Sequence, residues 1–193
     1  MLDWEALYQN NDTGWDRGGV SPALQIWLRN GALEQRSRVL IPGCGRGHEV
    51  VALAKQDFDV TGIDIAPTAI ACLKQTLASE KVKATALLND LFTYQPEQSF
   101  DVVYEQTCLC AIDPEQRAAY VQQLRIWLRP GGTLLLSMMQ TGETGGPPYH
   151  CDWIDMQGLF PSQHWQWQAD EPFIVPRWRP SPRFELGFRL VRV

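Results

Sequence analysis

The chain has 193 residues, a mass of 21.9 kDa, a formal net charge of −5 and a pI near 5.2. This acidic balance argues against nucleic acid as a partner, because a phosphate-binding surface is normally basic. No run approaches the about 20 apolar residues that cross a bilayer, so we expect no membrane partner. A hydrophobic fraction of 45% suffices for one core, and we expect one monomeric domain over residues 1–193.

Cysteine and histidine lack the spacing of a metal site or a disulfide framework. The cysteines are five, an odd number, and Cys108 and Cys110 leave only one residue between their thiols. The three histidines lie far apart in the chain, so the sequence predicts no metal. The first residues, Met-Leu-Asp-Trp-Glu, have neither the basic nor the apolar region of a secretory signal. We therefore expect a reducing, cytoplasmic location.

Strand patterns alternate with helical patterns along the first half of the chain. Short apolar or β-branched runs indicate the strands, and apolar residues at three- and four-residue spacing indicate the helices. A Pro-Gly pair stops the first strand, and Pro67 can open the second helix at its first position. The predicted elements are a strand at 37–41, a helix at 47–56, a strand at 58–63, a helix at 67–80 and a strand at 83–88.

The alternation continues in the second half and then changes. A long amphipathic pattern ends before Pro130-Gly131-Gly132, and the last segments pair most simply as an antiparallel end to the sheet. The Pro-rich piece at 172–182 predicts an irregular connection. The predicted elements here are a strand at 100–104, a helix at 114–128, a strand at 133–139, a helix at 153–159 and late segments at 164–168 and 184–193.

This order of elements is typical of a doubly wound, Rossmann-like α/β fold. Its sheet is mostly parallel and covered by helices on both faces. With the antiparallel end it has seven strands, and the strand at 37–41 lies centrally. Ligands of such sheets bind outside the carboxyl ends of the strands, where the winding reverses.

A glycine loop and a carboxylate lie at that edge and indicate an adenosine ligand. The loop Gly43-Cys44-Gly45-Arg46-Gly47 joins a strand to a helix, where glycine brings backbone N–H groups close to a ligand. Asp64 ends the second strand, 17 residues beyond Gly47, and is placed to accept from two ribose hydroxyls. His48 stands where a dinucleotide loop needs Gly or Ala, which disfavours NAD.

The segment after the third strand can serve the adenine ring. A carboxylate at Asp90 can accept from the adenine amino group, while Leu91 and Phe92 contact the ring. S-adenosylmethionine has no pyrophosphate and needs such contacts instead. Alternatively, Asp90 is a turn residue or a helix cap.

These residues, together with several longer pieces, resemble the class I S-adenosylmethionine-dependent methyltransferases, specifically the thiopurine S-methyltransferase family and its plant halide and thiol methyltransferase branch. The resemblance covers nearly the whole chain. It implies S-adenosyl-L-methionine as cofactor and a small-molecule acceptor. The matching pieces are Thr13-Gly14-Trp15-Asp16-Arg17-Gly18, Ile41-Pro42-Gly43-Cys44-Gly45, Gly62-Ile63-Asp64-Ile65, Ala111-Ile112-Asp113-Pro114-Glu115-Gln116-Arg117, Pro130-Gly131-Gly132 and Gly145-Gly146-Pro147-Pro148-Tyr149.

The resemblance implies that residues 1–30 form a lid over the cofactor, with aromatic side chains around the transferred methyl group. A sulfonium cation gains about 0.5–2 kcal/mol from facing an aromatic ring. These aromatics can also act as a hydrophobic staple of a surface helix. The expected cofactor-binding residues are Trp4, Tyr8, Trp15, Gly43, Cys44, Gly45, Asp64, Ile65, Asp90, Leu91, Phe92, Glu105 and Gln106.

The chain departs from the family pattern after the fourth strand. The family has an acidic residue followed by Arg or Tyr, whereas this chain has Glu105 and Gln106. If a base is needed, His150 and Asp152 are the candidates, and Tyr149 would orient the acceptor. The alternative for Asp152 is a helix cap.

The sequence thus favours methyl transfer to a small soft nucleophile: a thiol, a sulfide, a chalcogen oxyanion or a halide. Two other functions stay open. One is O- or N-methylation of a small metabolite, and the other is binding of S-adenosylmethionine without catalysis.

Overall fold

The computed structural model describes residues 2–168, 172–176 and 180–193. One mixed sheet runs through these residues, in the order β3-β2-β1-β4-β5-β8-β6, and β7 pairs with β8 off this path. The strands are β1 (Arg38–Pro42), β2 (Asp59–Asp64), β3 (Thr85–Leu88), β4 (Phe100–Gln106), β5 (Leu128–Gln140), β6 (Trp165–Trp167), β7 (Phe173–Ile174) and β8 (Phe184–Arg192).

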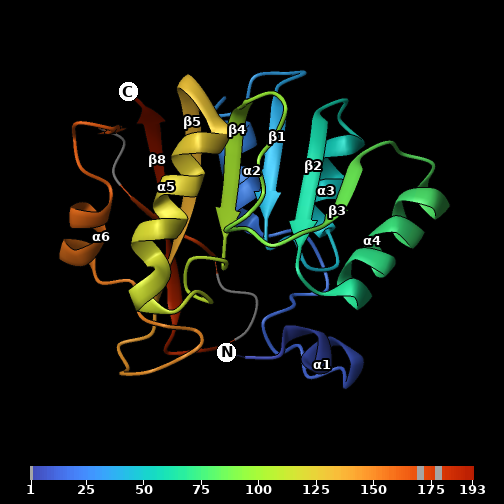
Figure 1. The fold of residues 1–193 in the computed structure, drawn as a ribbon, viewed down its shortest axis with the longest axis horizontal. Coiled ribbons are helices and arrows are strands. Elements are labelled where there is room, and N and C mark those ends of the chain that lie inside the picture. Colours follow the sequence, from blue (N-terminus) through green and yellow to red (C-terminus); the bar gives the residue numbers. More distant parts are fainter. Residues whose placement is uncertain (1, 169–171, 177–179) are drawn as a thin grey trace.

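The sheet has the predicted direction of its strands. β1 pairs in parallel with both β2 and β4, so the winding reverses at β1. β5 is parallel to β4, whereas β8 is antiparallel to β5, β6 and β7. The doubly wound fold with an antiparallel C-terminal end is confirmed. The carboxyl ends of β1, β2 and β4 meet at one edge, at the bottom of Figure 1.

Helices cover both faces of the sheet, as Figure 1 shows with α5 in front and α2 behind. Side chains of α2, α3 and α4 pack in one core cluster, and those of α5 and α6 in the other. The helices are α1 (Trp4–Gln9), α2 (Pro22–Arg29), α3 (His48–Ala54), α4 (Pro67–Glu80), α5 (Arg117–Trp127) and α6 (Trp153–Leu159). None of the helices in the described ranges is long and apolar enough to cross a membrane.

Most predicted elements are present, with three differences. The helix expected at 114–128 begins as a 3₁₀ turn, Pro114–Gln116, because Asp113 caps a short first turn through its side chain. β5 begins already at Leu128, so the Pro-Gly-Gly piece lies inside the strand rather than before it. The segment 172–182 contains β7, which pairs with β8; its residues 177–179 lie outside the described ranges.

The first helix is held on the carboxyl edge of the sheet by α4. Ala66 precedes α4 and has no side chain that can cap it. The Glu5 carboxylate of α1 takes this place: it accepts from the Thr68 N–H at 2.9 Å and from the Thr68 hydroxyl at 2.6 Å. Tyr8, one turn further on, packs against Ala66. These contacts dock α1 beside the glycine loop.

The second helix has a different role. Ser21 and Pro22 give α2 a capped start, and Ala23, Leu24 and Trp27 are buried in the core. Residues 22–29 are therefore part of the packed domain. Of the lid expected over residues 1–30, α2 thus packs in the core, and a lid formed by α1 and the loop that follows it stays a prediction.

Candidate active site at the glycine loop

The glycine loop leaves β1 in a conformation that other residues rarely adopt. Gly43 and Gly45 have φ angles of 58° and 54°, both in the left-handed region. A Cβ at Gly45 would lie 2.7 Å from the Tyr8 hydroxyl, and one at Gly43 would lie 2.9 Å from the Cys108 sulfur. Cys44 fixes the loop to the neighbouring strand, because its N–H donates to the Ile63 carbonyl at 2.9 Å. Glycine is thus required by conformation and by close approach.

Asp64 lies at the carboxyl end of β2, as predicted, and its carboxylate points at the glycine loop. It accepts from the Gly45 N–H at 2.8 Å and from the Ala66 N–H at 2.9 Å. The side chain is 7% exposed, and burial raises the pKa of its carboxyl group above the ordinary value. Ile65 follows with half of its surface open to solvent. The geometry leaves Asp64 with lone pairs for further donors.

The segment after β3 forms a tight turn. The Asp90 carboxylate accepts from the Phe92 N–H at 2.8 Å, which is the turn role considered as its alternative. Asp90 is exposed, while Leu91 and Phe92 are half-buried against the core below α5. The turn lies beside Asp64, because the Asn89 N–H donates to the Asp64 carbonyl at 3.1 Å. Contact of these three side chains with an adenine ring stays a prediction.

Three aromatic side chains of the N-terminal segment form one cluster over the glycine loop. The rings of Trp4 and Tyr8 each meet Trp15 edge to face, with centroids 5.3 and 5.7 Å apart. The Trp15 indole N–H donates to the Tyr8 hydroxyl at 3.5 Å. Within this cluster Tyr8 is buried, whereas Trp15 is 38% exposed and lies at its solvent side.

A cleft opens between Trp15, the glycine loop and the end of β4. Gln106 borders it and accepts from the Tyr104 hydroxyl at 3.0 Å. The other lining residues are Tyr8 of α1, Tyr104 and Thr107 at the end of β4, and residues from the segment 16–19, from β1 and the loop after it, and from the first turn of α3. The cleft thus lies where a doubly wound sheet binds ligands.

Charges of both signs border this cleft. Arg17 reaches inward and forms an ion pair with Glu185 of β8, in which both side chains are largely buried. Glu49 accepts from the Ser21 N–H at 2.8 Å, and burial raises the pKa of its carboxyl group. The Arg17 guanidinium is therefore matched by a carboxylate before any ligand enters.

Glu105 lies on the opposite face of β4 from the cleft-lining Gln106. Its carboxylate is fully buried, accepts from the Leu109 N–H at 2.5 Å, and has a second oxygen with no partner among the described residues. Burial raises the pKa of Glu105 to about 8, which keeps a neutral acid in the core at neutral pH. Its expected contact with the cofactor stays a prediction.

The three residues expected to serve the acceptor are held by backbone contacts. Thr141 and Gly142 both donate N–H groups to His150 Nδ1, at 3.0 and 3.3 Å, which assigns the ring proton to Nε2. Asp152 accepts from two N–H groups and caps α6, which is the alternative role that the sequence left open for it. The Tyr149 N–H donates to the Cys110 carbonyl at 2.7 Å. None of the three is among the described residues that line the cleft.

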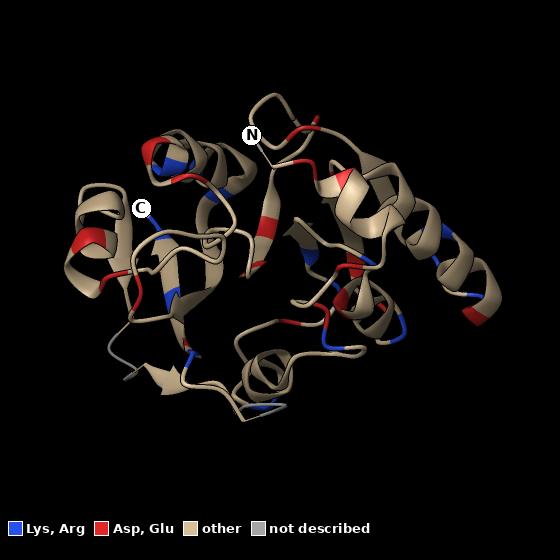
Figure 2. Cartoon of the chain, turned by 90° about the horizontal axis from the view of Figure 1, so that it is seen from below, with Lys and Arg blue, Asp and Glu red and all other residues tan. Residues whose placement is uncertain are grey.

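Four of the cysteines, Cys44, Cys108, Cys110 and Cys151, are buried in the core clusters. All five are free thiols, and burial raises the pKa of Cys108 and Cys110 well above the ordinary value. A thiol with a raised pKa stays protonated at neutral pH, and the thiolate rather than the thiol is the nucleophile. Among the residues described, no three His, Cys, Asp or Glu side chains gather as a metal site would need. In the view onto the carboxyl edge, Lys and Arg are spread over several elements rather than gathered on one surface (Figure 2).

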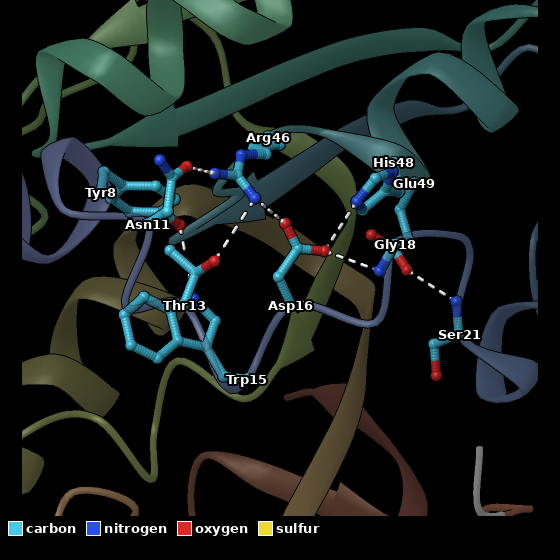
Figure 3. Close-up of polar contacts among 10 residues, drawn as sticks. All are labelled: Tyr8, Asn11, Thr13, Trp15, Asp16, Gly18, Ser21, Arg46, His48 and Glu49. Carbon is cyan, nitrogen blue, oxygen red and sulfur yellow. Dashed lines mark hydrogen bonds and ion pairs between the residues drawn. The ribbon is translucent and has the colours of Figure 1, made fainter. Parts of the chain in front are cut away.

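One polar network of the site was not foreseen from the sequence. Asp16 lies between Arg46 and His48, the residues on either side of Gly47 (Figure 3). The signal was present: Trp15-Asp16-Arg17 carries an acid and a base beside the predicted lid aromatic, and His48 replaces a small residue at the start of α3. Sequence spacing alone does not show that segments 30 residues apart meet.

Comparison with known proteins gives the family. The family model described as thiopurine S-methyltransferase matches residues 2–179. A thiocyanate methyltransferase from Arabidopsis thaliana is 36% identical over 152 residues, which cover 77% of this chain and 66% of the plant protein. A thiopurine S-methyltransferase from Pseudomonas putida is 31% identical over 94% of this chain and 90% of its own length. The chain spans just under two thirds of the plant protein.

The fold also recurs in solved structures. Magnesium protoporphyrin IX methyltransferase from Synechocystis, solved with bound S-adenosylmethionine, superposes with a TM-score of 0.73. The match covers 100% of this chain and 99% of that protein at 18% identity, which shows a shared class I methyltransferase fold. Together with the family match, these findings confirm the resemblance: the chain belongs to the thiopurine S-methyltransferase family of S-adenosylmethionine-dependent methyltransferases.

Proposed function

We propose that the protein transfers a methyl group from S-adenosylmethionine to a small soft nucleophile such as a thiol, a sulfide, a chalcogen oxyanion or a halide. The observation that carries the proposal is the cleft between Trp15, the glycine loop and Gln106, at the carboxyl ends of β1 and β4. The family match and the relatives that act on thiocyanate and thiopurines support this class of acceptor.

The residues present fit the cofactor. Asp64 offers a buried carboxylate to ribose hydroxyls, and the left-handed turn at Gly43 and Gly45 brings the backbone of the loop to the cleft. Trp15 and Tyr8 border the cleft with aromatic rings, whose faces attract a cation. When bound, S-adenosylmethionine supplies an electrophilic methyl group that the acceptor attacks in line, opposite the sulfur.

The protein contributes alignment and exclusion of water. Tyr8 and Trp15 lie over the glycine loop and line the cleft. Their rings restrict where an acceptor can bind and exclude water from that position. Gln106 can orient the acceptor through its amide N–H groups, since its oxygen already accepts from Tyr104. A thiol ionises by a few per cent at neutral pH, with a pKa of about 8.5, so no strong base is obligatory. His150 and Asp152 stay candidates for a base.

The charges at the cleft favour a small acceptor without a carboxylate. Arg17 is paired with Glu185, and Glu49 adds a second acidic group nearby. A carboxylated acceptor would have to separate Arg17 from Glu185 and leave that buried acid unpaired, which costs free energy. A small thiol or sulfide can bind without separating Arg17 from Glu185.

The test is a turnover assay with labelled S-adenosylmethionine against a panel of alkyl thiols, sulfide, iodide, phenols and amines. Methylation of a soft nucleophile with the highest kcat/KM is the expected result. A preference for phenols or amines would assign O- or N-methylation instead. Binding of S-adenosylhomocysteine without turnover of any acceptor would indicate a binding protein and contradict the proposal.

A further inference from the structure

Arg46 connects the glycine loop to the segment that carries Trp15. Its guanidinium donates from Nη1 to Asp16 Oδ2 at 2.8 Å and to the Thr13 hydroxyl at 3.3 Å. Nη2 donates to the Asn11 side-chain oxygen at 3.3 Å, and the guanidinium carbon lies 5.7 Å from the centre of the Tyr8 ring. One side chain of the loop thus contacts four residues of the N-terminal segment (Figure 3).

Asp16 closes the connection from the other side. Its Oδ1 atom meets His48 Nε2 at 2.9 Å and accepts from the Gly18 N–H at 2.8 Å, while Oδ2 accepts from Arg46. The Asp16 side chain is 12% exposed, so these contacts are largely shielded from water. Burial alone raises the pKa of Asp16, but the hydrogen bonds from Gly18, His48 and Arg46 outweigh it and lower the pKa overall.

The contacts have a consequence for Trp15. Asp16 is its chain neighbour, and the two basic residues that hold Asp16 flank Gly47 in the loop that faces the cleft. Displacement of Asp16 therefore moves Trp15 relative to the glycine loop. No other charged contact in the described residues joins segment 11–16 to the loop.

We propose that Arg46 and Asp16 form a latch that closes residues 11–18 over the glycine loop and holds Trp15 at the cleft. Both are positioning residues for methyl transfer, and the proposal rests on the proposed function. The Arg46 fork reaches acceptors on three residues at once, which the single ammonium group of lysine cannot do.

The test compares Arg46→Gln, Asp16→Asn and the double variant. Each single variant is expected to lower kcat/KM by about tenfold or more, mainly through kcat, because Trp15 is no longer held in place. The double variant should lose less than the sum of the two single losses, since both changes break the same Arg46–Asp16 ion pair. Arg46→Lys should recover part of the loss. Asp12→Asn, an exposed aspartate in the same segment, is the matched control and should act like the wild type.

Amide hydrogen exchange gives a readout that is independent of turnover. In complex with S-adenosylhomocysteine, residues 11–18 should exchange several-fold faster in both single variants, while the melting temperature and the exchange of β1 and β4 stay as in the wild type. Unchanged exchange of residues 11–18, or additive losses in the double variant, would overturn the latch. If one single variant unfolds, the other decides. If the wild type itself methylates no acceptor, the proposed function fails, yet exchange still reports on the latch.

Discussion

The carboxylate of Asp64 accepts the Gly45 N–H at 2.8 Å, so a side chain that ends β2 holds the loop that follows β1. This contact lies at the point where the winding of the sheet reverses. Asp64 therefore has two roles: it fixes the conformation of the glycine loop, and it offers its remaining lone pairs to a ligand.

Asp64→Ala is expected to weaken binding of S-adenosylhomocysteine by about 1–3 kcal/mol, because the ligand hydroxyls lose a buried charged acceptor. Titration calorimetry on the folded variant measures this loss. Asp59→Ala, at the exposed start of the same strand, is the control and should bind as the wild type does. An unchanged dissociation constant for Asp64→Ala would remove Asp64 from the cofactor site.

Glu105 makes stability depend on pH. Its pKa is raised from 4.5 to about 8 by burial, so the folded state keeps the proton that the unfolded chain releases. This contribution to stability is fully present below about pH 4.5 and is lost as pH rises through about 8. Glu105→Gln mimics the neutral acid and should remove the decline.

Thermal denaturation at several pH values checks this prediction. The melting temperature of Glu105→Gln should exceed that of the wild type by roughly 2 °C or more at pH 8.5, with a smaller difference at pH 5. A constant difference between the two proteins across this range would show that Glu105 does not titrate in the fold.

The sequence was sufficient for the alternating elements and for the residues at strand ends. The positions of Gly45 and Asp64 could be predicted from local sequence. Each lies at or just after the end of a predicted strand, and the ends of parallel strands lie at the carboxyl edge of the sheet. The polar network of Asp16, Arg46 and His48 does not follow, because it depends on where a loop folds back in space. Asp152 shows a different limit of the sequence. Its position is compatible with both a catalytic base and a helix cap, and only the structure shows that it caps α6.

Which side chains are buried in the core could not be predicted from the sequence either. Glu105 stands beside Gln106, but strand alternation sends one side chain into the core and the other to the cleft. Likewise α2 lies within the segment 1–30 that was expected as a lid, yet its apolar face is part of the core. Such outcomes depend on packing across the sheet rather than on local pattern.

Docking of α1 should depend on Glu5, which caps α4 from another segment. Glu5→Ala removes both acceptors of Thr68, so residues 4–9 should exchange amide hydrogens faster, with little change in β1 or β4. Glu34→Ala, an exposed acid beyond α2, is the control. Equal exchange of α1 in Glu5→Ala and wild type would mean that packing of Tyr8 alone holds the helix.

Acceptor choice should follow from Gln106, which borders the cleft where the family has Arg or Tyr. A neutral amide offers hydrogen bonds but no charge, and Arg17 is already paired with Glu185. A small neutral thiol should therefore have a higher kcat/KM than an aromatic thiol with a carboxylate. Gln106→Arg adds an unpaired cation at the same place and should shift the preference toward the anionic thiol.

The measurement is kcat/KM for a small alkyl thiol, a carboxylated aromatic thiol and iodide, on the wild type and on Gln106→Arg. The ratio of the two thiols should change by about tenfold between the proteins, which corresponds to about 1.4 kcal/mol in transition-state binding. If the wild type already prefers the carboxylated thiol by that factor, a cationic side chain elsewhere at the cleft binds the carboxylate, since Gln106 carries no charge. Arg17 and Arg46, whose guanidinium groups border the cleft, would then be the candidate anion partners, and Glu185 or Asp16 would have to release its arginine on binding.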